Sequence, residues 1–229
     1  MHIPDGFIDG PTSLVAGLVA IAGVALCLKK TSETLEDREI PVVGLAAAFV
    51  FAAQMLNFPV ASGTSGHLMG GVLAAVLVGP WAGGLAVTIV LAVQALLFAD
   101  GGLSALGLNV VNMALAGAFV GYGLFVLLRR ALGNTTWAVT TAAGIAGFVV
   151  PLIATALFMV EYAVGGNDAA SFGTVAAAMF GVHALIGIGE GIITALAIGA
   201  VMAARPDLVH GARGIDTRPT RSALQGART

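Results

Sequence analysis

The first two residues, Met1 and His2, offer three adjacent nitrogen atoms that could chelate one metal ion. The N-terminal amine and the backbone amide of His2 would close a five-membered ring around the ion. The same amide and Nδ1 of the His2 side chain would close a six-membered ring. These three nitrogens would lie in one plane and leave a fourth planar position open. The chelate requires a free amine on Met1, and any chain can begin with Met-His, so the motif alone is a weak signal.

A second histidine, His67, is the natural fourth ligand, because it is the one histidine in the glycine- and serine-rich segment that is expected on the same side of the membrane as Met1 and His2. Glycine lets a backbone fold tightly against another segment. The plainer alternative is a histidine that only hydrogen-bonds a backbone carbonyl, and Met1 and His2 tip the balance toward a metal ligand. Nearby polar residues could orient the ligands or attract the cation, although each could also serve only in a turn or a helix contact. These residues are Asp5, Asn57, Ser62, Thr64, Ser65 and Asp100.

The donor set restricts the choice of metal ion. Four nitrogens in a plane, one of them a deprotonated amide, suit Ni²⁺ or Cu²⁺. Zn²⁺ prefers a tetrahedron, whereas Mg²⁺ and Ca²⁺ prefer oxygen ligands. Co²⁺ is chemically acceptable but less favoured by strict planarity. The residues by themselves therefore leave Ni²⁺ and Cu²⁺ open, with Co²⁺ a weaker candidate.

The composition is typical of a polytopic membrane protein. The chain is 58% hydrophobic and 10% charged, with a mean hydropathy of +0.98, whereas soluble domains are about 25% charged. The single Cys27 provides neither a disulfide nor a thiolate cluster. Asp5 and Asp9 precede the first apolar stretch, where a signal peptide would have a cationic region, so we expect Met1 to be retained.

The apolar stretches predict an all-α protein with seven transmembrane helices, and six is the alternative. A spanning helix needs about 20 largely apolar residues. The third stretch is short and ends at Gly79-Pro80, so it could be tilted or partly re-entrant. The predicted spans are 12–28, 41–60, 66–79, 81–99, 107–128, 137–160 and 172–204.

The distribution of charge predicts the orientation of these spans. With seven spans, all ten cationic side chains fall on one side, which the positive-inside rule assigns to the cytoplasm. We therefore expect the N-terminus, His2 and the segment before His67 to face outward and the C-terminus to face inward. Residues 1–204 form one transmembrane domain, and residues 205–229 form a basic cytoplasmic tail that we expect to be solvated and flexible. The cations are Lys29, Lys30, Arg38, Arg129, Arg130, Arg205, Arg213, Arg218, Arg221 and Arg228.

Two further polar residues, His183 and Glu190, lie seven positions apart in the last span and therefore on one helix face. A metal relay or proton path is conceivable, but hydrogen bonds between helices are the favoured interpretation. The spacing from Gly187 to Gly191 indicates a close helix contact, either within the chain or with a partner. The chain lacks both a P-loop and a nucleophile–base arrangement, so it is not predicted to be an enzyme and active uptake would need energy from another chain.

The opening Met1-His2-Ile3-Pro4-Asp5-Gly6-Phe7 resembles that of the CbiM/NikM family, the substrate-binding membrane (S) components of energy-coupling factor transporters for cobalt and nickel. The similarity continues through residues 63–67, 79–81, 94–102, 106–109 and 121–123, and weakly at His183 and Glu190. The resemblance implies that Met1, His2 and His67 bind transported Ni²⁺ or Co²⁺, with no resident cofactor. The Pro4-Asp5-Gly6 sequence is nearer to the nickel branch.

The resemblance also implies partners and a location. The partners are a membrane coupling (T) subunit, cytoplasmic ABC-type ATPases and often a small auxiliary membrane subunit, without nucleic acid. The location is the plasma membrane of a bacterial or archaeal cell. A stand-alone secondary carrier or channel is the rival hypothesis, and it predicts a trail of polar ligands across the spans. A membrane enzyme or a structural subunit is a third hypothesis, which predicts that loss of His67 leaves the function intact.

Overall fold

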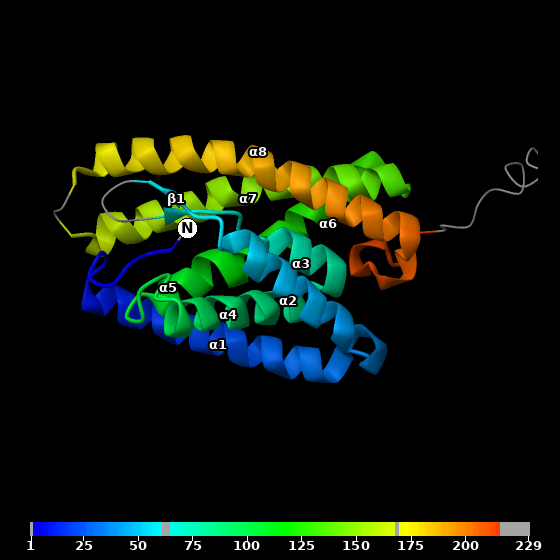
Figure 1. Cartoon of the computed structure of the whole chain (residues 1–229), viewed down its shortest axis with the longest axis horizontal. Helices are drawn as coiled ribbons and strands as arrows, with labels where there is room; N and C mark the ends of the chain where they lie inside the picture. The colour runs from blue at the N-terminus through cyan, green and yellow to red at the C-terminus, as the bar shows by residue number, and fades with distance from the viewer. Residues whose placement is uncertain (1, 61–64, 168–169, 216–229) are drawn as a thin grey trace, which may run out of the picture.

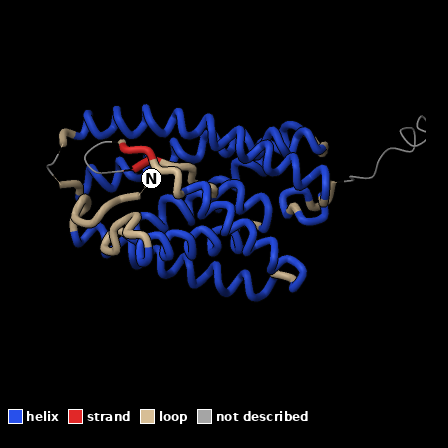
Figure 2. The backbone as a smooth tube through the Cα atoms, in the orientation of Figure 1, coloured by secondary structure: helices blue, strands red, loops and turns tan. Residues whose placement is uncertain are grey.

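The structure is a computed structural model that describes residues 2–60, 65–167 and 170–215. The described residues form a helical bundle with one two-stranded antiparallel ribbon (Figure 1; Figure 2). The expectation of an all-α fold with about seven helices is confirmed, if the continuous helical segment 106–132 is counted once. Its elements are α1 (Gly10–Thr34), α2 (Ile40–Gln54), β1 (Phe58–Pro59), β2 (Ser65–Gly66), α3 (Gly71–Val78), α4 (Pro80–Leu97), α5 (Leu106–Asn109), a π-helical stretch (Val110–Val120), α6 (Gly121–Leu132), α7 (Thr136–Gly165) and α8 (Phe172–Ala204).

Two of the predicted spans have the wrong bounds. Five described helices are long and apolar enough to cross a membrane, and α2 and α3 are not among them. The stretch 41–60 ends its helix at Gln54, and the stretch 66–79 is helical only from Gly71. Pro59 lacks the amide that a helix needs, and Gly70 has a left-handed φ of +73° where α3 begins. Among the described residues between the two helices, 58–59 and 65–66 form the ribbon, and 67–70 form a mostly apolar loop that leads into α3.

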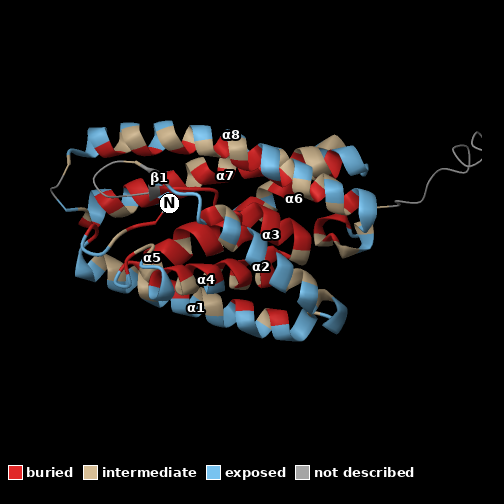
Figure 3. Ribbon diagram, in the orientation of Figure 1, coloured by how far each residue is buried: buried red, intermediate tan, exposed pale blue. Residues whose placement is uncertain are grey.

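The short helix α3 lies in the middle of the bundle, where the other helices surround it (Figure 3). Every residue of α3 except Val78 is buried. Glycines bring its neighbours close: a Cβ on Gly71 would lie 2.7 Å from the Cα of Gly117 in the π-helical stretch. Because protein rather than lipid covers α3, this helix does not have to be long enough to span a bilayer. It positions the loop that carries His67.

The two longest helices, α7 and α8, pack along one another and form one side of the bundle (Figure 1). A Cβ on Gly187 would lie 2.7 Å from the carbonyl oxygen of Phe148, and a Cβ on Gly191 would lie 2.7 Å from that of Gly144. Small residues allow such backbone approach. The close contact predicted from the glycine spacing is therefore internal, between α8 and α7.

The described cationic side chains gather at one end of the bundle, where α1, α6 and α8 end and α2 and α7 begin. Arg213 forms an ion pair there with Glu39. The segment after α8 folds back onto this end, with Val209 buried and the His210 ring 5.7 Å from that of Tyr122. The rest of the predicted tail, 216–229, lies outside the described residues. The chain start and the ends of α4 and α7 lie toward the opposite end of the bundle (Figure 1).

Candidate metal-capture site

The segment before α1 is folded into the protein. His2, Ile3 and Phe7 are each 3% exposed or less. The ring of Phe7 lies 5.3 Å from that of Tyr162 and 5.9 Å from that of Phe158, both on α7. Apolar burial of this kind ties the start of the chain to the bundle. Figure 1 shows the chain start lying beside the ribbon, inward from the point where α1 begins.

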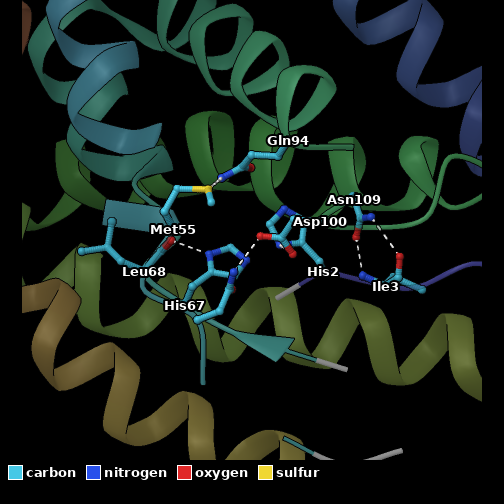
Figure 4. A network of polar contacts seen from close by, with 9 residues as sticks. His2, Ile3, Met55, His67, Leu68, Gln94, Asp100 and Asn109 are labelled. Atoms are coloured by element: carbon cyan, nitrogen blue, oxygen red, sulfur yellow. Dashed lines mark hydrogen bonds and ion pairs between the residues drawn. The ribbon is translucent and has the colours of Figure 1, made fainter. Parts of the chain in front are cut away.

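A pair of hydrogen bonds from Asn109 fixes the segment directly behind His2 (Figure 4). The Ile3 amide donates to Oδ1 of Asn109 at 2.8 Å, and Nδ2 of Asn109 donates to the Ile3 carbonyl at 3.2 Å. The Gly102 amide also donates to the Ile3 carbonyl, at 2.9 Å. The amide and the carbonyl of Ile3 therefore both have hydrogen-bond partners, although the residue is fully buried.

The rest of the segment is held by the two neighbouring loops. Asp5 accepts hydrogen bonds from the amide and the hydroxyl of Ser104 at 2.7 and 2.5 Å. These bonds lower the pKa of the Asp5 carboxyl. After α7, the amide of Asn167 donates to the Phe7 carbonyl at 3.1 Å, and its side chain donates to the Gly6 carbonyl at 3.0 Å. Asp5 thus anchors the segment through Ser104.

His67 follows β2 and is completely buried. Its Nδ1 lies 2.7 Å from the Leu68 carbonyl oxygen. A carbonyl can only accept, so Nδ1 carries the proton and the lone pair is on Nε2, the atom that a metal would use. Burial lowers the pKa of His67 well below its ordinary value, and the nearby rings of His2 and His183 lower it further. The ring is thus neutral, as a metal ligand must be.

His2 and His67 meet in the interior of the protein. Their ring centroids are 4.3 Å apart and the rings are inclined by 32°. Neither nitrogen of the His2 ring makes a hydrogen bond with a described residue, although Nδ1 lies 3.1 Å from Oδ1 of Asp100. Burial lowers the pKa of His2, and the contact with Asp100 offsets only part of that effect. The His2 ring is therefore a neutral imidazole beside His67.

The loop after α4 forms the wall behind His2. Asp100 accepts a hydrogen bond of 2.7 Å from Asn57, which ties this loop to the end of α2. Burial alone would raise the pKa of Asp100, but its contacts with His2 and Asn57 outweigh burial and lower it. Gly101 has a φ of +91°, and a Cβ there would lie 3.0 Å from Cδ2 of His2. Only glycine combines this conformation with so close a contact.

Glu190 and His183 on α8 are also buried. Glu190 accepts hydrogen bonds from the amides of Met69 at 2.7 Å and Gly70 at 2.9 Å, and so it holds the loop that joins His67 to α3. His183 Nδ1 lies 2.8 Å from the carbonyl oxygen of Met179. Both residues thus have structural contacts, and they do not pair with each other.

The structure brings together His2, His67, Asn57 and Asp100, whereas Asp5 faces Ser104. Met1, Ser62 and Thr64 lie outside the described residues, and Ser65 is described only as part of β2. Sequence reasoning missed the anchoring roles of Ser104 and Asn167. For Asn109, a polar residue in an apolar stretch indicates a structural hydrogen bond, but nothing in the sequence identifies Ile3 as its partner.

The described part of the chain contains no group of three or more His, Cys, Asp or Glu side chains arranged to hold a metal ion. A site built on His2 and His67 therefore needs further donors from outside that set, such as backbone nitrogen or the terminal amine. Two neutral imidazoles and such nitrogens suit a transition metal ion rather than Mg²⁺ or Ca²⁺.

Comparison with known proteins places the chain in a family. The family model CbiM, described as the cobalt uptake substrate-specific transmembrane region, matches residues 2–208. A protein of Haloquadratum walsbyi named as a candidate metal transport protein is 42% identical over 214 residues, which cover 91% of this chain and 93% of the relative. The candidate fused nickel transport protein NikMN of Archaeoglobus fulgidus is 39% identical over 210 residues, which cover 92% of this chain and 68% of the relative.

The fold agrees with this assignment. A crystal structure of a truncated transition metal transporter matches with a TM-score of 0.83 at 30% sequence identity, covering 89% of this chain and 99% of the other. The chain thus belongs to the CbiM family, and it is a multi-pass membrane component of cobalt or nickel uptake rather than an enzyme.

Proposed function

We propose that this chain captures Ni²⁺, with Co²⁺ as the alternative, in a planar site of four nitrogens. The ligands are the amine of Met1, the backbone amide and Nδ1 of His2, and Nε2 of His67. The observation that carries the proposal is the burial of the His2 and His67 side chains with their ring centroids 4.3 Å apart. The lone pair on Nε2 of His67 supports it, because the Leu68 carbonyl holds the proton on Nδ1.

The surroundings of His2 support capture with loss of protons. Asp100 lies 3.1 Å from Nδ1 of His2 and provides negative charge next to the proposed cation. An amide nitrogen binds a metal only after it loses its proton, so each captured ion releases protons and affinity falls in acid. The bonds from Asn109 to Ile3 set the position of the His2 amide before the ion arrives. This preorganisation reduces the entropy lost on binding.

The choice of Ni²⁺ over Co²⁺ rests on the planar donor set, because a d⁸ ion gains most from planarity. The names of the relatives do not indicate which of the two ions is preferred. The description of the family model names cobalt, whereas the name of the Archaeoglobus relative names nickel. Competition between the two ions on the purified chain would measure the preference directly.

The site faces the outside in this proposal. The described cationic side chains lie at the end where α8 finishes, and the positive-inside rule assigns that end to the cytoplasm. The chain start then receives ions from the outer side. Because the chain has no P-loop, the energy for uptake comes from the partners that the family implies, which are a membrane coupling subunit and cytoplasmic ATPases, with a small auxiliary membrane subunit.

The test is Ni²⁺ binding to the purified chain with its native start, compared with protein that retains the formyl group on Met1. Formylation removes the amine with the smallest possible change. A single added residue is not a suitable block, because His2 would become the third residue and its imidazole, two amides and the new amine would form another planar chelate. We expect formylation to abolish tight binding and the yellow absorbance of planar Ni²⁺.

Histidine variants provide the matched control. His67→Gln should also abolish tight binding, whereas His210→Gln should not, because His210 lies at the opposite end of the bundle. Tight binding that survives both formylation and His67→Gln would overturn the proposed site. Flux of Ni²⁺ into liposomes that contain this chain alone would favour a stand-alone carrier instead.

A further inference from the structure

His183 is a buried histidine on the face of α8 that points into the protein. It is completely buried, and it shares this face with Met179, Gly187 and Glu190. Its Nδ1 lies 2.8 Å from the Met179 carbonyl oxygen, one turn back on the same helix. The carbonyl only accepts, so Nδ1 carries the proton and Nε2 has the lone pair. Nε2 has no hydrogen-bond partner among the described residues.

The backbone beside His67 packs against the same part of α8. A Cβ on Gly66 would lie 2.7 Å from Cδ1 of Ile186 and 3.4 Å from Cγ1 of Val182. These two residues flank His183 in the sequence. Further along the same helix face, Glu190 holds the amides of Met69 and Gly70. The loop that carries His67 is thus fixed to α8 on both sides of His67, at the level of His183.

His67 and His183 have the same local arrangement. In each ring the Nδ1–H donates to a backbone carbonyl oxygen, so Nε2 carries the lone pair that could bind a metal ion. A buried polar atom without a hydrogen-bond partner, such as Nε2 of His183, is unfavourable, so such atoms are uncommon unless they serve a function. Nε2 of His183, which has no hydrogen-bond partner among the described residues, is therefore ready to bind a transition metal ion without any change of tautomer.

We propose that His183 is a second metal ligand, which binds Ni²⁺ or Co²⁺ together with His67 when the planar N-terminal site opens. This inference rests on the proposed function. In the planar site four nitrogens satisfy the ion and His183 is not needed. When the His2 nitrogens leave, the His2 amide takes back one proton from water and the ion loses ligands. Nε2 of His183 replaces one of them, so that two imidazoles hold the ion on its way out of the site.

Other groups on this face of α8 are less suited to that role. The carboxylate of Glu190 is occupied by two backbone amides. Thr194 is buried and its hydroxyl has no hydrogen-bond partner among the described residues, but a neutral hydroxyl is a weak ligand for Ni²⁺. Thr194 therefore serves as a matched control, because it is an equally buried polar residue of α8 with an unpaired side-chain atom.

The experiment opens the planar site by substitution and then asks whether His183 matters. Ni²⁺ affinity is measured by titration of the full chain carrying His2→Ala, with and without His183→Gln. We expect His183→Gln to weaken the residual affinity of the His2→Ala protein about tenfold or more. With His2 intact, His183→Gln should leave the tight affinity unchanged within about twofold, because the planar set does not use it. Thr194→Val should leave the affinity unchanged in both backgrounds.

A spectroscopic readout separates ligation from a structural effect. With Cu²⁺ as a paramagnetic probe, electron spin echo modulation counts bound imidazoles. We expect two in the His2→Ala protein and one after His183→Gln is added. An equal count, or an equal residual affinity with and without His183, would overturn the inference and leave the planar site intact. Failure of the native protein to bind Ni²⁺ tightly would instead overturn the proposed function.

Discussion

The side chain of Asn109 pairs with the backbone of Ile3 through both of its polar atoms, at 2.8 and 3.2 Å. The two residues are 106 positions apart, and both are buried. The side-chain amide of Asn109 thus accepts from the Ile3 amide and donates to the Ile3 carbonyl, as the backbone of a neighbouring β-strand would do. The contact joins the last residue of α5 to the residue directly after His2. It therefore sets the position of the His2 amide relative to His67.

We predict that Asn109→Ala lowers Ni²⁺ affinity while the chain stays folded. The substitution leaves the amide of Ile3 buried without its partner, which costs about 1–3 kcal/mol. If the segment can leave its place to regain water, the cost is expressed as a loss of affinity of about tenfold to a hundredfold. Titration of the purified chain with Ni²⁺ measures the loss.

The matched control for Asn109 is Asn112→Ala. Asn112 is a buried asparagine of the same helical segment that donates to Glu161 at 2.7 Å instead. Removing it should alter thermal stability without a comparable change in Ni²⁺ affinity. Equal losses of affinity in the two variants would show that Asn109 has no special connection with the chain start.

We predict that Gly101→Ala weakens metal binding through a direct contact with His2. The φ of +91° disfavours any side chain, and the new Cβ would lie 3.0 Å from Cδ2 of His2. Left-handed backbone costs a non-glycine residue about 1–2 kcal/mol. Gly133 is the matched control, because its φ is +99° and a Cβ there meets nothing within 4 Å. Both variants should melt at lower temperature, but only Gly101→Ala should lower Ni²⁺ affinity.

The sequence predicted the parts of this molecule that depend on composition and on side-chain chemistry. Long apolar stretches predict long helices, and the helix from 172 to 204 has the predicted bounds. The chemistry of a Met-His start predicted that His2 and His67 share one site, and the structure brings these two side chains together. Binding of the metal itself remains a prediction.

The missed features depend on backbone conformation and on contacts between distant residues. Leu68, Met69 and Gly70 are apolar, so a hydropathy pattern cannot distinguish their loop from a helix. The π-helical stretch from 110 to 120 reads as an ordinary apolar helix for the same reason. The bonds from Ser104 to Asp5 and from Asn167 to Gly6 join residues 99 and 161 positions apart, and no local spacing predicts such pairs.

We predict that Glu190→Gln weakens Ni²⁺ binding through the loop of His67. The carboxylate accepts from two successive amides, those of Met69 and Gly70. A glutamine side chain has one oxygen to accept with, and its amino group would face the second amide donor. One buried amide then loses its partner, at a cost of about 1–3 kcal/mol. We expect lower thermal stability together with a fall of about tenfold in affinity.

The control for Glu190 is Glu161→Gln. Glu161 is a part-buried carboxylate on α7 that accepts a hydrogen bond from Asn112, whereas Glu190 accepts from the loop of His67. It loses the same charge, so any effect of charge alone should appear in both variants. A planar Ni²⁺ spectrum of unchanged intensity in Glu190→Gln would rule out a positioning role for Glu190.

The last prediction concerns the pH dependence of the metal-free chain. Hydrogen bonds from Ser104 lower the pKa of Asp5 below the ordinary 3.8. A carboxyl whose pKa is lower in the folded state stabilises that state above its ordinary pKa. The contribution is lost as the pH falls from about 4 through the lower, folded value. Asp5 is exposed, so solvent screening keeps the effect small.

Melting temperatures of the metal-free chain should therefore fall less steeply below about pH 4 in Asp5→Asn than in the native protein. Ser104→Ala should flatten the profile similarly, because it removes one of the bonds that shift the pKa. Parallel profiles in all three proteins would show that Asp5 does not couple the chain start to folding.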